Sequence, residues 1–282
     1  MAKCDLGKTI IDELKLCYRA EPTLLEELSL MKIGDEHEYG DFTFRRETKK
    51  HYKYGFNIYY ANKQIATFNF KRYGSLPQYE NNVIYRIENN VLYNKDLLDV
   101  SFKLPKMLDM IFCHITSIDL ARDYRFNVVS RIRKMAKDEK TKVIVNGKAI
   151  DKKKNVIGGK FIFAMNFTKL HDPSICIKQA KAKNDKTQGM TLCGYNKNEE
   201  IEVSSHKNYI KDFYANPKRL YRLEVHQNNK DIKKYCEDND IVQDIALIYN
   251  QDFLDGMYIA HLSSLLRFTR SRTKIDWDEI LH

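Results

Sequence analysis

The side chains of this chain most able to do chemistry lie in three short strand-like segments. They are Asp119 in the first segment, Tyr195 and Lys197 in the second, and Glu224 and His226 in the third. Alternate side chains of a β-strand share one face, so each segment presents its functional groups together. If the three strands are neighbours, a phenol, two carboxylates and an imidazole converge above one sheet. These groups suit a metal-assisted phosphodiester transfer through a covalent tyrosine intermediate.

In such a reaction the side chains divide into a nucleophile and ligands of a divalent ion. The Tyr195 hydroxyl attacks phosphorus and leaves a free 3′-OH. Asp119, Glu224 and His226 are the candidate ligands, and an ion held there polarises the phosphate. Their oxygen and nitrogen atoms suit Mg²⁺ or Mn²⁺ as the cofactor. Lys197 either lowers the pKa of the phenol or contacts the phosphate.

Each of these assignments has a competing interpretation. Asp119 and Glu224 interrupt apolar strands, where a salt bridge to Arg122 or Arg222 would also compensate their burial. His226 is either a ligand or a surface residue. The chain has eighteen tyrosines, and most tyrosines serve packing.

Tyr209 is the second candidate nucleophile. It lies in a segment that we expect to be helical, with Ser205 as the residue that caps its start, and many nicking enzymes carry their tyrosine on a helix. There are therefore two alternative predictions for the nucleophile, which are Tyr195 on a strand and Tyr209 on a helix.

The positive charge of the chain is concentrated in one stretch. The net charge is +10, and residues 131–186 hold sixteen Lys and Arg against five Asp and Glu. A basic stretch is either a solvated surface or a surface that attracts a phosphate backbone without reading its sequence. The candidate DNA-binding residues are Arg122, Lys152, Lys153, Lys154, Lys181, Lys183 and Arg222. We therefore expect DNA as a partner, either single-stranded or as a hairpin.

The composition is that of a soluble globular protein. No apolar stretch approaches the roughly 18 residues that a membrane-spanning helix needs, and the N-terminus lacks the apolar core of a signal peptide. The six cysteines never form a CxxC pair. We interpret them as reduced, buried thiols rather than a disulfide framework or a zinc site. These features predict a cytoplasmic protein without a membrane partner.

The pattern of elements predicts an α+β fold. Residues 10–18 alternate as a strand, although a helical period also fits, and residues 54–72 read as strand, turn and strand. We expect helices at 95–110, with Pro105 opening a new segment, and at 126–137. The expected division is 1–105 for a β-rich half, 106–235 for a catalytic half and 236–282 for a short helical C-terminus. The two halves echo one another, which suggests an antiparallel sheet built from two ferredoxin-like (RRM-like) units.

Five motifs occur in the order seen in one family. They are Ile11–Leu16, the loop Tyr73–Asn82, Ser117-Ile118-Asp119, Tyr195-Asn196-Lys197 and Arg222-Leu223-Glu224. This set resembles the replication initiators of filamentous phages and rolling-circle plasmids, a diverged branch of the HUH-type nicking endonucleases, from about residue 10 to 235. Ser117 stands where the family has arginine, and His226 at a position that is not usually histidine.

The resemblance implies a protein of a bacterial host cell that nicks and rejoins an origin through a phosphotyrosine bond with a divalent metal. It also implies host helicase and polymerase as partners. Two other classes stay open. One is a DNA-binding protein without catalysis, which would use its basic face and aromatic residues such as Tyr52, Tyr54 and Phe56. The other is a phage structural protein that keeps only the fold.

Overall fold

The computed structural model describes residues 6–150, 174–179 and 189–281. The chain divides into two compact units. Unit 1 comprises Met1–Ile11, Asp119–Tyr235 and Leu247–His282, and unit 2 comprises Asp12–Ile118 and Cys236–Ala246. Strands β1 (Thr9–Arg19) and β7 (Ile111–Tyr124) run through the boundary and contribute residues to both units.

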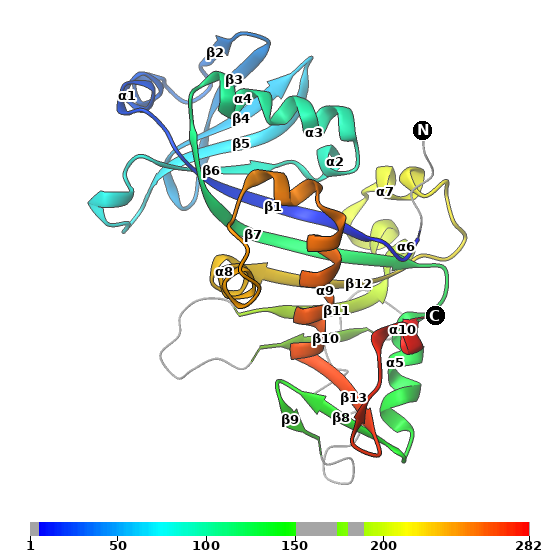
Figure 1. Ribbon diagram of the computed structural model, residues 1–282. Coiled ribbons are helices and arrows are strands. Elements are labelled where there is room, and N and C mark those ends of the chain that lie inside the picture. Colours follow the sequence, from blue (N-terminus) through cyan, green and yellow to red (C-terminus); the bar gives the residue numbers. More distant parts are fainter. Residues whose placement is uncertain (1–5, 151–173, 180–188, 282) are drawn as a thin grey trace. The chain divides into compact units, whose positions relative to one another are not determined.

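Unit 2 is built on an antiparallel meander of strands (Figure 1). Besides parts of β1 and β7 its strands are β2 (Glu36–Tyr39), β3 (Phe42–Lys49), β4 (Tyr52–Tyr60), β5 (Lys63–Arg72) and β6 (Asn82–Ile87). Consecutive strands from β2 to β6 pair with one another, and β6 pairs with β1. The expected strand, turn and strand at 54–72 is confirmed as β4 and β5. Ala61 and Asn62 both have positive φ, as a tight two-residue hairpin turn requires.

Aromatic rings fill the core of unit 2. Phe44, Phe56, Phe68 and Phe70 are fully buried, and their ring centroids lie 5.4–6.4 Å apart. Edge-to-face and offset contacts of this kind add to the large apolar area that each ring buries. The expectation that Phe56 could hold bases of DNA is therefore wrong, because its ring belongs to this core.

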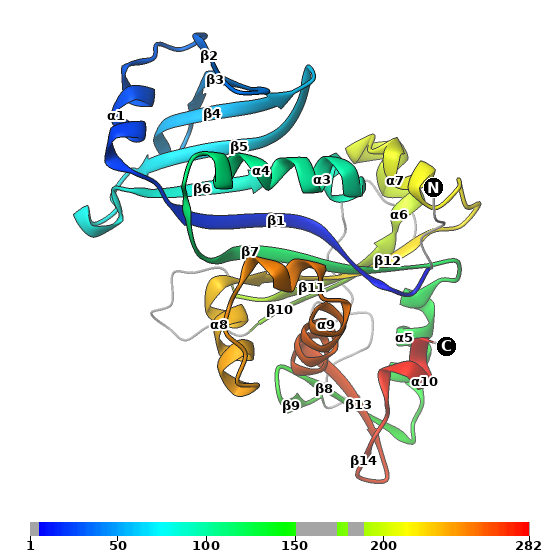
Figure 2. The same cartoon turned by 45° about the horizontal axis from the view of Figure 1, so that its top comes forward.

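Short helices accompany the strands of unit 2 (Figure 2). They are α1 (Pro22–Leu30), η1 (Pro77–Tyr79), α2 (Asn89–Leu92), α3 (Lys95–Ser101) and α4 (Lys103–Met107). Asn94 caps α3 by accepting a hydrogen bond from the Leu97 amide, and the Tyr85 hydroxyl donates to the Ser101 carbonyl at 3.0 Å. The predicted helical region at 95–110 thus divides into two helices, and Pro105 lies inside the second one rather than at its start.

Unit 1 contains two sheets. One has the order β10 (Ile175–Lys178), β11 (Thr191–Asn196), β12 (Tyr221–Asn228) and β7, and the other has the order β14 (Thr273–Lys274), β13 (Leu266–Arg270), β8 (Thr141–Val145) and β9 (Lys148–Ala149). The helices are α5 (Val128–Lys137), α6 (Lys197–Glu200), η2 (Ile201–Ser205), α7 (Asn208–Phe213), α9 (Gln251–Leu265) and α10 (Trp277–Leu281). Two further elements, α8 (Asn229–Asp238) and η3 (Ile245–Tyr249), contribute residues to both units.

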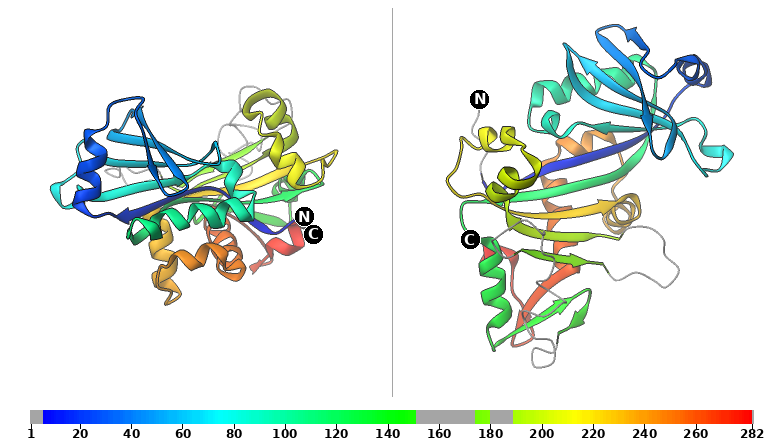
Figure 3. Two further views of the ribbon diagram at one scale, coloured as in Figure 1. Left: turned by 90° about the horizontal axis from the view of Figure 1, so that it is seen from above. Right: turned by 180° about the vertical axis from the view of Figure 1, so that it is seen from behind.

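Helices α5 and α9 cover one face of β11 and β12. The Tyr258 hydroxyl of α9 donates to the Leu223 carbonyl at 3.0 Å. A Cβ on Gly194 would lie tightly against Leu223 of β12 at 3.1 Å and at an ordinary contact distance of 3.4 Å from Val129 of α5, so this residue faces the helix. Seen from behind, the strands lie in front of α9 and show their other face (Figure 3, right). Because Gly194 faces α5, the alternate side chains of Cys193 and Tyr195 point to the opposite face of the strands.

These elements confirm the α+β class with a large antiparallel sheet and overturn two local expectations. The C-terminal segment is not wholly helical, because β13 and β14 form a hairpin between α9 and α10. Ser205 does not cap the helix of Tyr209, because a turn of π-helix ends there and α7 begins three residues later. None of the described helices is long and apolar enough to cross a membrane.

The packing of His261 leads to a prediction about acid stability. Its Nδ1 lies 2.6 Å from the Gln227 Oε1, and burial lowers the pKa of the imidazole to about 4. In the unfolded chain this imidazole takes up a proton near pH 6.5, whereas in the folded chain it stays neutral down to about pH 4. The free energy of unfolding therefore decreases as the pH falls through that interval. We expect this residue to account for up to about 3 kcal/mol of that loss. Urea unfolding of the wild type and of His261→Gln should show stabilities that converge between pH 7 and pH 4, and a constant difference would contradict the prediction.

Candidate active site

The pairing of β11 with β12 places the predicted residues on one face. Tyr195 lies opposite Arg222, Cys193 opposite Glu224, and Thr191 opposite His226. Directly opposed residues of antiparallel strands point to the same side of the sheet. We call this side, away from α5 and α9, the polar face. The expected shared face of Tyr195, Glu224 and His226 is therefore confirmed.

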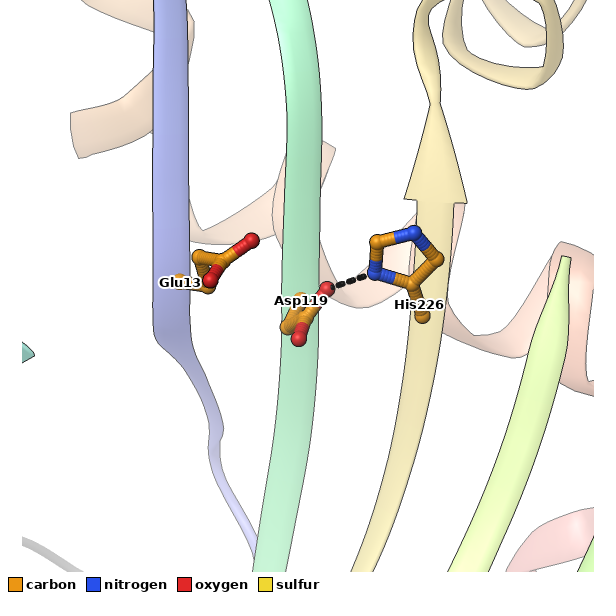
Figure 4. A group of neighbouring side chains, drawn as sticks. All are labelled: Glu13, Asp119 and His226. Atoms are coloured by element: carbon orange, nitrogen blue, oxygen red, sulfur yellow. Dashed lines mark hydrogen bonds and ion pairs between the residues drawn. The ribbon is translucent and has the colours of Figure 1, made fainter. Parts of the chain in front are cut away.

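Strand β7 adds Asp119 to the polar face. β7 is the neighbour of β12, and the Asp119 carboxylate forms a hydrogen bond with Nδ1 of His226 (Figure 4). The two side chains are 21% and 25% exposed, so a small ligand can reach them. A carboxylate on one ring nitrogen fixes the orientation of an imidazole and directs its other nitrogen outward, as in many metal centres.

Figure 4 also draws Glu13, which the sequence reasoning did not single out. It lies on β1 in unit 2, where its carboxylate contacts Lys15 at 2.6 Å and Arg86 at 3.1 Å. The signal that could have drawn attention to it is local. Like Asp119 and Glu224, it is an acid inside a strand-forming segment, although Asp12 directly precedes it.

Tyr195 and Glu224 form the second contact of the polar face. The Tyr195 hydroxyl donates to Oε2 of Glu224 at 3.0 Å, and Nζ of Lys197 lies 3.4 Å from the same hydroxyl oxygen. The ammonium also pairs with Glu200 at 3.0 Å. Tyr195 is only 4% exposed, whereas Glu224 is half-buried. A carboxylate on the hydroxyl and an ammonium beside it are the groups that would accept a phenol proton and stabilise a phenolate.

Lys197 reaches Tyr195 by a different route from the expected one. The strand ends at Asn196, whose side chain caps α6 by accepting from the Glu199 amide, and Lys197 is the first residue of that helix. The expectation that Lys197 continues the strand is therefore wrong. The turn nevertheless returns its ammonium to the tyrosine hydroxyl.

Two arginines expected to contact DNA are instead structural. The Arg222 guanidinium donates to both oxygens of Asp123 at 2.8 and 2.6 Å, and both side chains are fully buried. Arg122 donates to Thr9 at 2.9 Å and to Asp255 at 2.6 Å, and is 9% exposed. Each compensates a carboxylate within the fold, so neither presents its charge to a DNA phosphate.

These arginines also answer the competing interpretation of the acids on the polar face. Asp119 contacts His226 and Glu224 contacts Tyr195, while Arg122 and Arg222 pair with other carboxylates. Among the described residues, the carboxylates that pair with these two arginines are therefore Asp255 and Asp123.

The remaining predicted residues are not placed on the polar face. Five of the candidate DNA-binding residues lie outside the described residues; they are Lys152, Lys153, Lys154, Lys181 and Lys183. Tyr209, the competing nucleophile, lies half-buried on α7. The groups that the structure brings together on the polar face are therefore those around Tyr195 and around the pair of Asp119 and His226.

No protein-family model matches the chain, and no curated protein matches it. Among solved structures the chain is similar to one described as Methanococcus jannaschii TBP, with 8% sequence identity, a TM-score of 0.26, and coverage of 88% of this chain and 99% of that one. At that level of similarity the match carries no conclusion about function.

Proposed function

We propose that this protein is a rolling-circle DNA replication initiator, which nicks and rejoins single-stranded DNA at an origin through a phosphotyrosine intermediate. The observation that carries the proposal is the Tyr195 hydroxyl, held 3.0 Å from the Glu224 carboxylate and 3.4 Å from the Lys197 ammonium. Asp119 and His226 lie on the same polar face. The proposal includes the resemblance to rolling-circle initiators and a catalytic sheet built from two ferredoxin-like halves.

The chemistry that we propose for the polar face begins with a proton transfer. Glu224 accepts the proton of the Tyr195 hydroxyl, and the phenolate oxygen attacks phosphorus while Lys197 stabilises the negative charge. The bond from phosphorus to the 3′-oxygen breaks, and that oxygen takes up a proton to leave a free 3′-OH. Attack of a 3′-OH on the phosphotyrosine reverses the step and rejoins the strand.

The donor set of the polar face fits a divalent ion. The Asp119 carboxylate and the His226 imidazole are partly accessible and hydrogen-bonded to each other, and oxygen and nitrogen donors suit Mn²⁺ or Mg²⁺. Glu224 is two residues from His226 on the same strand face, but among the described residues its carboxylate does not form a three-ligand group with Asp119 and His226. The ligands that we propose are therefore Asp119 and His226. An ion bound by these residues would polarise the scissile phosphate and lower the barrier to attack.

Metal binding without DNA tests the assignment of the ligands. We expect Asp119→Asn and His226→Gln each to weaken Mn²⁺ binding by about 10–100-fold, because each variant loses a donor or the group that orients it. Titration of free Mn²⁺ by electron paramagnetic resonance measures the affinity directly. Asp138→Asn is the matched control, since Asp138 is an acid that pairs with Arg270 at 3.0 Å outside the polar face. Equal affinity in all four proteins would remove these residues from the metal site.

A DNA-binding protein without catalysis is the second candidate, and the burial of Tyr195 favours it. In unit 2 the ammonium groups of Lys53 and Lys71 lie 5.3 and 5.8 Å from the centroid of the Tyr54 ring. Lys53 is exposed, and cations around a partly exposed aromatic ring suit a nucleic-acid backbone. The two candidates differ in one result: only the initiator forms a denaturation-resistant adduct with a single-stranded origin oligonucleotide in Mg²⁺ or Mn²⁺.

A further inference from the structure

Two thiols face each other across the outer strands of the polar face. Cys176 of β10 and Cys193 of β11 are directly paired in the antiparallel register, and their Sγ atoms lie 3.7 Å apart. Both cysteines are free and half-buried. Neither residue has a part in the proposed nicking reaction, and the sequence gives no CxxC spacing that would single them out.

We propose that Cys176 and Cys193 are a redox modification site, which a peroxide converts reversibly into a cross-strand disulfide. Directly opposed residues of antiparallel strands have Cα atoms about 4.5–5.5 Å apart, which lies within the usual range for a disulfide. The sulfur atoms need only side-chain rotation to come from 3.7 Å to bonding distance. The backbone of β10 and β11 can therefore keep its pairing in both states.

The chemistry requires one peroxide for each disulfide. The Cys176 thiolate attacks one peroxide oxygen, the O–O bond breaks, and the sulfur becomes a sulfenic acid while the departing oxygen is protonated to water or an alcohol. The Cys193 sulfur then attacks the sulfenic sulfur, loses its proton, and expels water as the S–S bond forms. Two thiols are oxidised by two electrons, and the peroxide is reduced. A dithiol reductant reverses the modification by thiol–disulfide exchange.

The surroundings assign different roles to the two thiols. The hydrogen bond from Cys193, helped by the nearby Lys178, lowers the pKa of Cys176 to about 7. A thiol is nucleophilic as its thiolate, so Cys176 is the attacking residue and Cys193 the resolving one. A disulfide of this kind in a reducing compartment serves redox sensing.

The position of the site links it to the polar face. Cys193 lies directly opposite Glu224 and two residues before Tyr195 on the same strand face. A disulfide removes the Cys193 thiol from beside Glu224 and ties β11 to β10. The modification itself depends only on the two cysteines, so it stands whether or not the chain nicks DNA.

Peptide mapping of the full chain tests the proposal. The reduced protein is treated with a small excess of hydrogen peroxide at neutral pH, alkylated, and digested with trypsin. We expect a linked pair of peptides that contain Cys176 and Cys193, with the loss of two hydrogens, and the return of both alkylated peptides after treatment with dithiothreitol. Cys17 and Cys113 are the internal control, because burial raises the pKa of Cys17 to about 12 and a protonated thiol reacts slowly.

Single variants separate the two roles. In Cys193→Ser a dione probe should capture a sulfenic acid on Cys176, whereas Cys176→Ser should consume peroxide roughly tenfold more slowly than the wild type. The proposal is overturned by a bridge between Cys17 and Cys113 in place of the expected one. It is equally overturned by irreversible oxidation of Cys176 without a bridge, or by equal rates in the wild type and Cys176→Ser.

Discussion

Tyr195→Phe is expected to abolish the covalent protein–DNA adduct while leaving the fold and DNA binding in place. The variant removes only the hydroxyl that donates to Glu224, and the buried ring still packs. Loss of a nucleophile lowers the rate of the chemical step and leaves the affinity for DNA unchanged. We expect the rate of adduct formation to decrease by at least about 10³-fold. The lost hydrogen bond should cost only about 1 kcal/mol of folding stability. A denaturing gel of a labelled single-stranded origin oligonucleotide with Mg²⁺ or Mn²⁺ measures the adduct.

Tyr209→Phe is the matched control for this experiment. Tyr209 is a half-buried tyrosine of α7, so the same change of one hydroxyl is made a short distance along the chain. We expect the control to form the adduct at the wild-type level. An adduct that persists in Tyr195→Phe and disappears in Tyr209→Phe would assign the nucleophile to the helix. The absence of an adduct from the wild-type protein, together with retained DNA binding, would support the binding protein instead.

Glu224→Gln extends the same test to the proton acceptor. The amide keeps the size of the side chain and can still accept from the Tyr195 hydroxyl, but it cannot take up the proton. Adduct formation should therefore fall steeply with little change in stability, and a fully active Glu224→Gln would exclude Glu224 as the base.

The buried ion pair of unit 1 should give the largest change in stability. Arg222→Ala leaves the fully buried carboxylate of Asp123 without the guanidinium that neutralises it. Removing one partner of such a pair costs about 3–5 kcal/mol, because an uncompensated charge stays in a medium of low polarity. Urea unfolding followed by circular dichroism measures the loss. Asp123→Asn should also destabilise the protein, because it leaves the buried Arg222 guanidinium without its carboxylate.

An exposed ion pair of the same unit provides the comparison. Lys211 contacts Glu202 at 2.8 Å, but the glutamate side chain is 66% exposed, so Lys211→Ala should cost no more than about 1 kcal/mol. Replacing both buried partners, as in Asp123→Leu with Arg222→Met, should restore part of the stability lost in the single variants. A small effect of Arg222→Ala, comparable to that of Lys211→Ala, would show that water reaches the pair.

The alternation of side chains along single strands was predictable from the sequence. Asp119, Tyr195 and the pair of Glu224 and His226 each lie in a segment of β-forming residues, and the period of two places them on a face without knowledge of the rest of the chain. The α+β class and the hairpin at Ala61 and Asn62 follow from equally local signals. These features depend on backbone geometry, which acts over a few residues.

The partners of each side chain were decided only by the tertiary structure. The sequence alone does not distinguish an arginine that binds DNA from an arginine that pairs with a buried acid. Arg222 pairs with Asp123, which lies ninety-nine positions away in the chain. The thiol pair depends on the register of β10 against β11, and the approach of Lys197 to Tyr195 depends on the turn at Asn196. The sequence by itself thus determined the shared strand face of Glu224 and His226, but not the position of Lys197 at the start of α6. Long-range pairing and burial decided which of them are structural and which remain accessible for chemistry, because both are set by strands and helices distant in the chain.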